Sequence, residues 1–551
     1  MSGQARPRTI AVLGGGISGL TAAYSLSRSL LNHRIIVLEA SSRLGGWVHS
    51  ERVRVHEPPV QQDATALLES GPRSLMPGKY KGIRTLEMVA DLGLADRMVL
   101  VPRTSKSAKN RFLYYGGKLN RLPSSLFGAI GAAMRLPVIR ETLSGVIREP
   151  WVQQKATMHE DESVHSLVSR RFGQPLADNL VSAMMHGIYA GDSRELSAQS
   201  IVPFLMDLEE THGSVLRALI PFPSKLNKKF KEGMKSRSAE DKQKALKVAK
   251  RMDPQFVEKM RKTSIYSFPN GLQEIIDALS DRVMATQNTE FRMGSACTQI
   301  ELNADGFALG VQNEVGKLQV DRVVAALPSA KLATLLPDLP HLDYNPAATL
   351  SVVDVILAPP DGSIMQYKLP IEGFGFLVPR SAKNNPDEIL GVVLDSDAVP
   401  NQGQADASGK PPFIKMTVMM GGPYWRGKKH SELPTVKEAE GRALRALHNM
   451  LGIPMSILEN HVRYLSGHIL KDTIPQYLVG HPKRMQELHD ALISDPRWRD
   501  RLTLLGFSYA GVGINDCVAN ALDASDAVIQ QELGIHSDDT TSVGTGLSLA
   551  M

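Results

Sequence analysis

The residues whose chemistry is clearest are a group of closely spaced glycines near the start of the chain and one acidic residue that follows them. Gly14-Gly15-Gly16-Ile17-Ser18-Gly19 directly follows the apolar run 9–13, and Glu39 ends a second apolar run. An acid about 20 residues after such glycines is typical of a dinucleotide-binding βαβ unit. Its glycines allow a tight turn, a close approach to a pyrophosphate and close helix packing, while the helix N-terminus faces the phosphates and the acid binds a ribose. We therefore predict a strand at 9–13, a helix at 20–30 and a strand at 34–38.

The segment after Glu39 indicates which dinucleotide is bound. It reads Ala40-Ser41-Ser42-Arg43-Leu44-Gly45-Gly46-Trp47. An arginine and a glycine pair that follow the ribose-binding acid and pass the pyrophosphate are typical of FAD proteins, so FAD is favoured over NAD. A later turn-forming loop, Gly71-Pro72-Arg73-Ser74, is predicted to lie with its backbone against the flavin ring.

A second strand–loop–helix pattern stands near the end of the chain. An apolar run at 502–506 leads into a loop of small residues at 507–516, which contains Phe507, Val512, Gly513 and Ile514, and a helix is predicted after it to about 531. This helix N-terminus can also face a cofactor. Because the first fingerprint lies so far upstream, we predict a discontinuous domain that the chain leaves and later completes.

The remaining periodicities position these motifs. A hairpin is predicted at 110–117, because the run 110–114 leads into the turn-forming pair Gly116-Gly117. Helices are predicted at 164–172, 176–189 and 272–279. Strands are predicted at 291–302, 318–327, 374–379, 390–394 and 414–420.

Composition excludes several classes of function. The two cysteines, Cys297 and Cys517, make a disulfide scaffold or a cysteine metal site untenable, and no paired-histidine spacing indicates a metal. The longest apolar stretch, 126–134, ends at Arg135 and is too short to span a bilayer. Apolar residues interrupted by arginines between 122 and 151 fit either helices resting on a membrane surface or ordinary core helices.

The net charge of +6 comes from one segment, since residues 221–262 contain 14 Lys/Arg and 5 Asp/Glu. We interpret this segment as a solvated, partly helical insertion, with attraction to an anionic membrane as the alternative. It has few aromatic residues for base stacking, so nucleic acid is not an expected partner.

Taken together, these motifs closely resemble the protoporphyrinogen oxidase family, of the eukaryotic mitochondrial type, within the flavin amine oxidase superfamily. The resemblance covers nearly the whole chain. Beyond the fingerprint and the closing motif, it is carried by Asn110-Arg111-Phe112-Leu113-Tyr114, Gly191-Asp192-Ser193-Arg194-Glu195-Leu196-Ser197 and Ile474-Pro475-Gln476-Tyr477. It implies FAD-dependent oxidation of protoporphyrinogen IX to protoporphyrin IX, a six-electron reaction in haem biosynthesis that uses O₂ and yields H₂O₂.

The resemblance also assigns roles to residues. Arg111 would pair with a substrate propionate, and the carbonyl of Gly187 would accept a pyrrole N–H. Phe374, Leu377 and Met419 would clamp the tetrapyrrole over the flavin. The cofactor-binding residues would be Gly14, Gly15, Gly16, Ile17, Ser18, Gly19, Glu39, Ala40, Arg43, Gly46, Trp47, Gly71, Pro72, Arg73, Ser74, Ala296, Phe507, Val512, Gly513 and Ile514. No side chain is expected to be catalytic, because the flavin takes the hydride. His186 stands where relatives often have Arg, which leaves a second propionate anchor unassigned.

The expected fold class is α/β, α+β overall, with a discontinuous Rossmann-like FAD-binding domain at 5–95, 265–340 and 495–535. A mixed-sheet substrate domain would use 96–120, 195–215 and 341–494, and a helical membrane-associating domain 121–194. Residues 216–264 would form a basic insertion, either disordered or partly helical, and 536–551 a flexible tail.

The resemblance further implies peripheral association with the intermembrane-space side of the mitochondrial inner membrane. The implied partners are a second copy in a homodimer and ferrochelatase, to which product is channelled. Two alternatives stay open at this stage: a flavin amine or polyamine oxidase, and a non-enzymatic relative of the GDP-dissociation-inhibitor type.

Overall fold

The computed structural model describes residues 7–55, 65–123, 136–154, 160–219, 237–361, 363, 365–400, 402, 412–535 and 544–547. The apolar stretch predicted at 126–134 lies outside these residues, as do 220–236 of the basic segment. In the part of the chain so described, no helix is long and apolar enough to cross a membrane.

A five-stranded parallel sheet assembles strands from distant parts of the chain. Its order is β19-β13-β1-β2-β9, and every neighbouring pair is parallel. The strands are β1 (Thr9–Leu13), β2 (Arg34–Leu38), β9 (Thr289–Arg292), β13 (Arg322–Ala325) and β19 (Leu502–Leu504). The two chain ends therefore meet in one sheet, and the predicted α/β fold class is confirmed.

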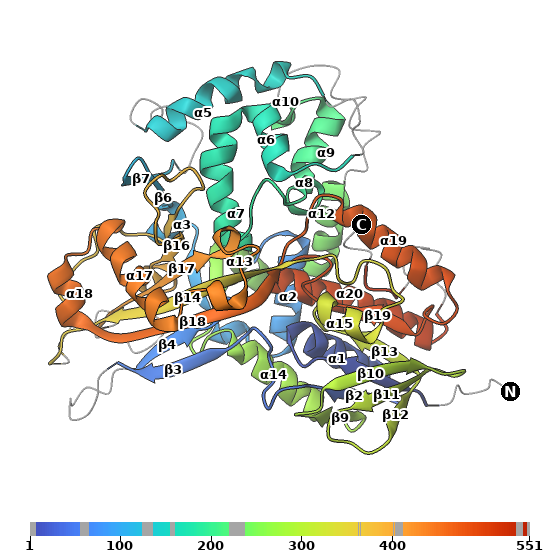
Figure 1. Ribbon diagram of the computed structural model, residues 1–551. Coiled ribbons are helices and arrows are strands. Elements are labelled where there is room, and N and C mark those ends of the chain that lie inside the picture. Colours follow the sequence, from blue (N-terminus) through green and yellow to red (C-terminus); the bar gives the residue numbers. More distant parts are fainter. Residues whose placement is uncertain are drawn as a thin grey trace.

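Both faces of this sheet are covered, as the sequence of β1 requires. Ile10 and Val12 point into one core cluster and Ala11 and Leu13 into another, because successive side chains of a strand alternate between faces. The first face is covered by helices α1 (Ile17–Ser29), α2 (Lys79–Asp91), α14 (Gln273–Met284) and α20 (Ile514–Glu532). The second is covered by strands β10 (Cys297–Leu302), β11 (Phe307–Val311) and β12 (Lys317–Val320) with helices α15 (Ser329–Leu335) and α19 (His481–Ser494). Figure 1 shows α1 and α20, from opposite ends of the chain, side by side.

A seven-stranded mixed sheet forms the second body, with the order β18-β14-β17-β16-β15-β6-β7. Its strands are β6 (Phe112–Tyr115), β7 (Lys118–Arg121), β14 (Ala347–Leu357), β15 (Gly375–Leu377), β16 (Ile389–Val393), β17 (Ile414–Gly421) and β18 (Val462–Pro475). Helix α17 (Val436–Asn449) packs alanines and a leucine on one face, beside α18 (Met455–His461), and α16 (Asp395–Ala398) follows β16. The opposite face is the one that bears on function.

Helices gather at the end of this sheet, at the top of Figure 1. They are α5 (Pro137–Arg148), α6 (Val164–Phe172), the π-helical turn η3 (Leu176–Val181), α7 (Ser182–Tyr189), α8 (Ala198–Ile201), α9 (Pro203–His212) and α10 (Val215–Leu219). A fully buried ion pair joins them: Arg171 Nε donates to Glu149 Oε1 at 2.8 Å. The Glu149 carboxylate also accepts the Ser214 hydroxyl at 2.5 Å, so helices distant in sequence share one buried charge.

Smaller elements connect the two sheets. Strands β3 (Ser50–Arg54) and β4 (Thr65–Glu69) form a hairpin, and β5 (Val99–Pro102) pairs with β8 (Thr263–Ser267), with α3 (Lys106–Lys109) following β5. Within the basic segment, α12 (Arg237–Ala249) lies against α2 and α13 (Pro254–Lys262) runs directly into β8. The described part of that segment is therefore helical and packed.

Three sequence-based expectations need correction. The single strands predicted at 291–302 and 318–327 are each two strands, β9 with β10 and β12 with β13, because each run turns between two sheets. The tail predicted to be flexible contains residues 544–547, which bond to β19 and bury Leu547 completely. The hairpin at 110–117 and the helix at 164–172 are confirmed.

Candidate functional site

The glycine fingerprint forms a narrow backbone cradle. Gly14 has φ +101° and lies against Ala326, and a Cβ on Gly19 would come 1.9 Å from the Gly14 carbonyl oxygen. Gly16 is the N-cap of α1 and has no side-chain cap, so the first N–H groups of that helix are left to a ligand. A Cβ on Gly46 would come 3.3 Å from Gly16 Cα. The two backbones thus face each other with no side chain between them.

Glu39 is held at the mouth of this cradle. One carboxylate oxygen accepts the Gly15 N–H at 2.7 Å, and the other accepts the Ser41 N–H at 2.8 Å. The Glu39 carbonyl accepts the Ser295 N–H, which brings Ala296 next to this acid. These contacts place the two predicted adenosine-side residues together.

The loop after Glu39 is shaped by its arginine. Arg43 donates to the Gly46 carbonyl at 2.6 Å and also to the Leu44 and Val48 carbonyls, so its side chain braces the turn. Ala40 and Trp47 are exposed on either side of this turn. A Cβ on Gly71 would come 2.1 Å from the Trp47 carbonyl oxygen, so the loop 71–74 can pass this turn only with a glycine at that position.

The side chain of Arg73 points away from the glycine cradle and toward the seven-stranded sheet. Its guanidinium donates to Asp395 Oδ1 at 2.6 Å and to Thr417 Oγ1 at 2.7 Å, inside a buried polar cluster on the seven-stranded sheet. Burial raises the pKa of nearby Glu69 to about 7, although its bonds from Ser50 and from the Leu272 N–H act in the opposite direction. The side chain of Arg73 therefore anchors loop 71–74 to the sheet, which leaves the backbone of Pro72 and Ser74 for a ligand.

Two residues that sequence reasoning did not assign hold the closing loop. Lys81 Nζ donates to Asp516 Oδ1 at 2.7 Å and to the Ala510 carbonyl at 3.0 Å. The Tyr477 hydroxyl donates to the Phe507 carbonyl and accepts the Gly511 N–H at 2.8 Å. Tyr477 lies in the Ile474–Tyr477 motif, which was a signal for it, whereas nothing in the sequence marks Lys81. Gly513, the N-cap of α20, has no side-chain cap, so Val512, Gly513 and Ile514 present a second helix N-terminus.

On the substrate side, Arg111 lies over an aromatic ring without an acidic partner. Its guanidinium carbon is 4.5 Å from the centroid of Phe374, and the side chain remains exposed to solvent. Desolvation of the guanidinium lowers the pKa of Arg111. Across the residues that the structure describes, no carboxylate forms an ion pair with it. The guanidinium is thus oriented by a cation–π contact and keeps its hydrogen-bond donors for another group.

Leu377 and Met419 lie on one face of the sheet, on either side of Gly391. Leu377 pairs with Gly391 of β16, and Gly391 pairs with Met419 of β17, so all three positions share a face. Phe374, Leu377 and Met419 are only partly buried, although their neighbours Phe376, Val378, Val418 and Met420 are almost completely buried. Leu377 leans over Gly391, where a Cβ would stand only 3.0 Å from Leu377 Cδ2. We call the partly buried apolar face formed by Phe374, Leu377 and Met419 the slot; a flat apolar ligand could lie against it.

Gly187 of helix α7 lies over the slot, against Leu377. A Cβ at Gly187 would come 2.5 Å from Leu377 Cδ2, so α7 can approach the sheet only at a glycine. The N–H of Gly191, which would ordinarily bond to the Gly187 carbonyl, bonds to Met185 O instead. The Gly187 carbonyl therefore lies in the last helical turn without an intrahelical donor.

The cofactor loops and the slot converge. Thr417, which accepts a bond from Arg73, lies two residues before Met419 on the same face of β17. From the other side, Gln476 donates to the Tyr189 carbonyl at 2.9 Å, and the Asp516 carboxylate adds to burial in raising the pKa of Tyr189. The end of α7 thus reaches the N-terminus of α20.

His186 is turned away from the slot. Its Nδ1 is 2.9 Å from the Val378 carbonyl and its ring packs edge-on against Tyr424. Burial lowers its pKa, which favours the neutral imidazole. His186 therefore has no geometry for binding a second propionate.

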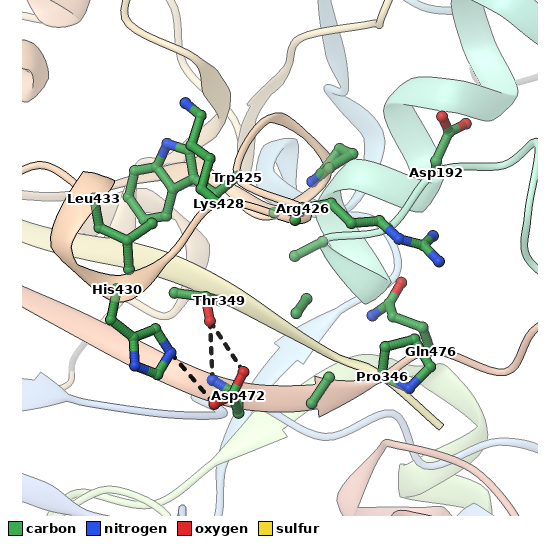
Figure 2. Close-up of a pocket in the computed structure, with 17 residues that line it drawn as sticks. Asp192, Pro346, Thr349, Trp425, Arg426, Lys428, His430, Leu433, Asp472 and Gln476 are labelled. Atoms are coloured by element: carbon green, nitrogen blue, oxygen red, sulfur yellow. Dashed lines mark hydrogen bonds and ion pairs between the residues drawn. The ribbon is translucent and has the colours of Figure 1, made fainter. Parts of the chain in front are cut away.

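A pocket of about 140 Å³ lies beyond the end of α7, between residues 190–192, 346–349 and 422–433. Figure 2 shows His430 and Thr349 directed at Asp472 across this pocket. Its other charged groups are also paired, Arg426 with Glu195 and Lys428 with Glu388. It is separate from Arg111 and Phe374, and no sequence pattern pointed to it.

Comparison with known proteins agrees with this geometry. Residues 17–529 match the family model described as flavin containing amine oxidoreductase. The protoporphyrinogen oxidase of Schizosaccharomyces pombe is 32% identical over 93% of this chain and 96% of its own length, and that of Homo sapiens is 31% identical over 95% and 99%. The crystal structure of a putative protoporphyrinogen oxidase from Exiguobacterium sp. 255-15 superposes with a TM-score of 0.69 at 22% identity, covering 95% of this chain and 99% of that one.

The chain belongs to the flavin containing amine oxidoreductase family and, within it, to the protoporphyrinogen oxidases. It is an FAD-dependent oxidoreductase. The site fits this cofactor on its own evidence: a side-chain-free cradle at Gly16 and Gly46, two uncapped helix N-termini, and a carboxylate at the ribose position.

We predict that Gly19→Ala abolishes FAD retention, because the added methyl group would lie 1.9 Å from the Gly14 carbonyl oxygen. Overpacking of this kind costs about 1–3 kcal/mol. The matched control is Gly441→Ala, also within a helix, where the nearest atom to the new Cβ is the flexible Arg445 side chain at 3.6 Å. Bound flavin is measured by absorbance after gel filtration. If both variants keep equal flavin, the cradle is not tight at Gly19.

Proposed function

We propose that this protein oxidises protoporphyrinogen IX to protoporphyrin IX in haem biosynthesis, with O₂ as the final acceptor and H₂O₂ as product. The observation that carries the proposal is Arg111, an exposed guanidinium that stacks on Phe374 and has no acidic partner in the described structure, at the edge of the slot. A flat tetrapyrrole with carboxylate side chains matches both features, because guanidinium binds carboxylate bidentately.

The residues of the slot bind and orient the substrate. Leu377 and Met419 contact the macrocycle on either side of Gly391, and Phe374 fixes both the ring edge and the Arg111 guanidinium. The Gly187 carbonyl accepts a pyrrole N–H, which fixes the rotation of the macrocycle. Bound FAD supplies the acceptor for a hydride from a methylene bridge of the substrate. The protein contributes position and exclusion of water rather than a general base.

A polyamine oxidase is the weaker alternative. A polycationic substrate requires unpaired carboxylates, whereas the acids beside the site are neutralised, Asp395 by Arg73 and Asp516 by Lys81. The free charge at the slot is positive and would repel such a substrate.

We predict that Arg111→Ala raises the KM for protoporphyrinogen IX by at least about tenfold, the loss expected for one charge-assisted hydrogen bond. FAD content should stay at the wild-type level, because Arg111 makes no contact with the cofactor loops. The measurement is initial-rate porphyrin fluorescence with parallel flavin absorbance. Lys109→Ala, an exposed cation two residues away, is the control and should leave KM unchanged. A matching loss of FAD in Arg111→Ala would mean that the residue is structural.

We further propose that the protein lies on the intermembrane-space surface of the mitochondrial inner membrane through α5 and the turn after it. Leu143, Ile147 and Trp151 repeat every four residues and are 37%, 60% and 72% exposed. The exposed Arg140 and Arg148 flank them, the pattern of a helix lying in a lipid interface. The sequence resemblance to the mitochondrial type supports this compartment. It likewise supports a homodimer that channels product to ferrochelatase.

We predict that Ile147→Asp with Trp151→Asp weakens binding to vesicles of phosphatidylcholine and an anionic phospholipid by at least about tenfold, since each buried side chain contributes roughly 1.5–3 kcal/mol. Activity on detergent-dispersed substrate should persist. Leu31→Asp, at a 71% exposed site after α1, is the control and should bind as the wild type does. Vesicle flotation measures binding. Equal binding by all three proteins would exclude α5 as the membrane-facing element.

A further inference from the structure

The segment 544–547 forms a turn that lies against the edge strand β19. The Leu504 N–H of β19 donates to the Thr545 carbonyl at 2.9 Å, so the segment covers the outer edge of the parallel sheet. Leu547 is 0% exposed and joins the core cluster that includes Leu488 and Leu502. The turn is thus held at a sheet edge by one backbone bond to β19 and by one apolar anchor, Leu547.

Three polar side chains of the body are arranged around this segment. Thr503 Oγ1 donates to the Gly544 carbonyl at 2.5 Å, Asn520 Nδ2 donates to the Gly546 carbonyl at 2.6 Å, and His489 Nδ1 lies 2.8 Å from Thr545 Oγ1. Thr503 and Asn520 are only 1% and 2% exposed. A buried donor that loses its acceptor costs about 1–3 kcal/mol. Strand β19 and helices α19 and α20 therefore present polar side chains whose hydrogen bonds the segment completes. Such an arrangement is typical of a groove that binds a peptide.

The groove is selective for the sequence that occupies it. Gly546 has φ +81°, and a Cβ there would come 2.0 Å from the Leu504 carbonyl oxygen. Glycine is thus required at this position, and the next residue must fill an apolar pocket. Thr545-Gly546-Leu547 meets both requirements.

The groove also connects to the flavin site. Thr503 belongs to β19, which enters the closing loop, and Asn520 belongs to α20, which leaves it. The segment bonds to both and so ties the two arms of that loop together. Gly506, just after β19, lies beside Ser18 of the fingerprint helix. Displacing the segment would loosen β19 against α20 and widen the mouth of the cofactor site.

We propose that β19, α19 and α20 form a peptide-binding groove whose ligand is residues 544–547 of the same chain, and that its occupation holds the closing loop against FAD. Occupation sets how tightly the cofactor is retained. This inference does not depend on the identity of the substrate.

The first test uses the full chain with Leu547→Asp, which places a charge in a fully buried pocket. We expect the dissociation constant for FAD to rise at least about tenfold and Tm to fall by several degrees. Leu533→Asp, at a 53% exposed site after α20, is the matched control and should behave as the wild type. Wild-type flavin affinity in Leu547→Asp would overturn the proposal. Thr503→Val, which removes only the buried hydroxyl, provides a milder variant with the same expected direction should Leu547→Asp not fold.

The second test separates a groove from general stability. A fluorescently labelled peptide with the sequence of residues 542–551 should bind Leu547→Asp, whose groove is vacated, and restore its FAD affinity, but should not bind the wild type. The same peptide carrying Gly546→Val should do neither. Anisotropy measures peptide binding, and flavin fluorescence measures retention. Failure of the native peptide to bind or to restore FAD affinity would overturn the groove.

Discussion

The parallel pairing of β1 with β13 on one side and β2 on the other is the constraint on which the rest of the structure depends. A central parallel strand is buried on both faces, so helices and a second layer must cover it. It also places the N-terminus of α1 at the carboxyl edge of the sheet, where ligands bind in such folds. Since β13 and β19 come from much later in the chain, the cofactor site is complete only when segments from both ends of the chain have joined one sheet.

The cofactor loops and the seven-stranded sheet are joined by buried polar contacts. Arg73 reaches from the cofactor loop to Asp395 and Thr417 on the seven-stranded sheet. Tyr477 reaches from the end of that sheet to the closing loop. Each contact would leave a buried donor or acceptor unsatisfied if the bodies separated, so the slot and the flavin loops keep one relative position.

Local patterns made much of this predictable. The apolar runs at 9–13 and 34–38, the glycines between them and the closing motif led to the right elements, because backbone geometry at a dinucleotide site permits few residue types. Partnerships between distant side chains were not predictable. No sequence pattern near Arg73 predicts its contact with Asp395, and none near His186 predicts its contact with the Val378 carbonyl. The small polar tail looked disordered by composition, yet its residues at 544–547 match a groove whose parts come from β19, α19 and α20.

Whether an arginine is paired with a carboxylate indicates its role, structural or ligand-binding, more clearly than its position in the sequence does. Arg171, Arg84 and Arg380 are tied to carboxylates, and those pairs fasten one helix or loop to another. Arg111 is desolvated enough to lower its pKa, yet it faces an aromatic ring instead of an acid. A guanidinium held over a ring keeps its hydrogen-bond donors for a ligand or water, because the ring face takes up the charge but not these donors. A ligand carboxylate can accept two of these hydrogen bonds at once, and because the Phe374 ring already orients the guanidinium, less conformational entropy is lost on binding.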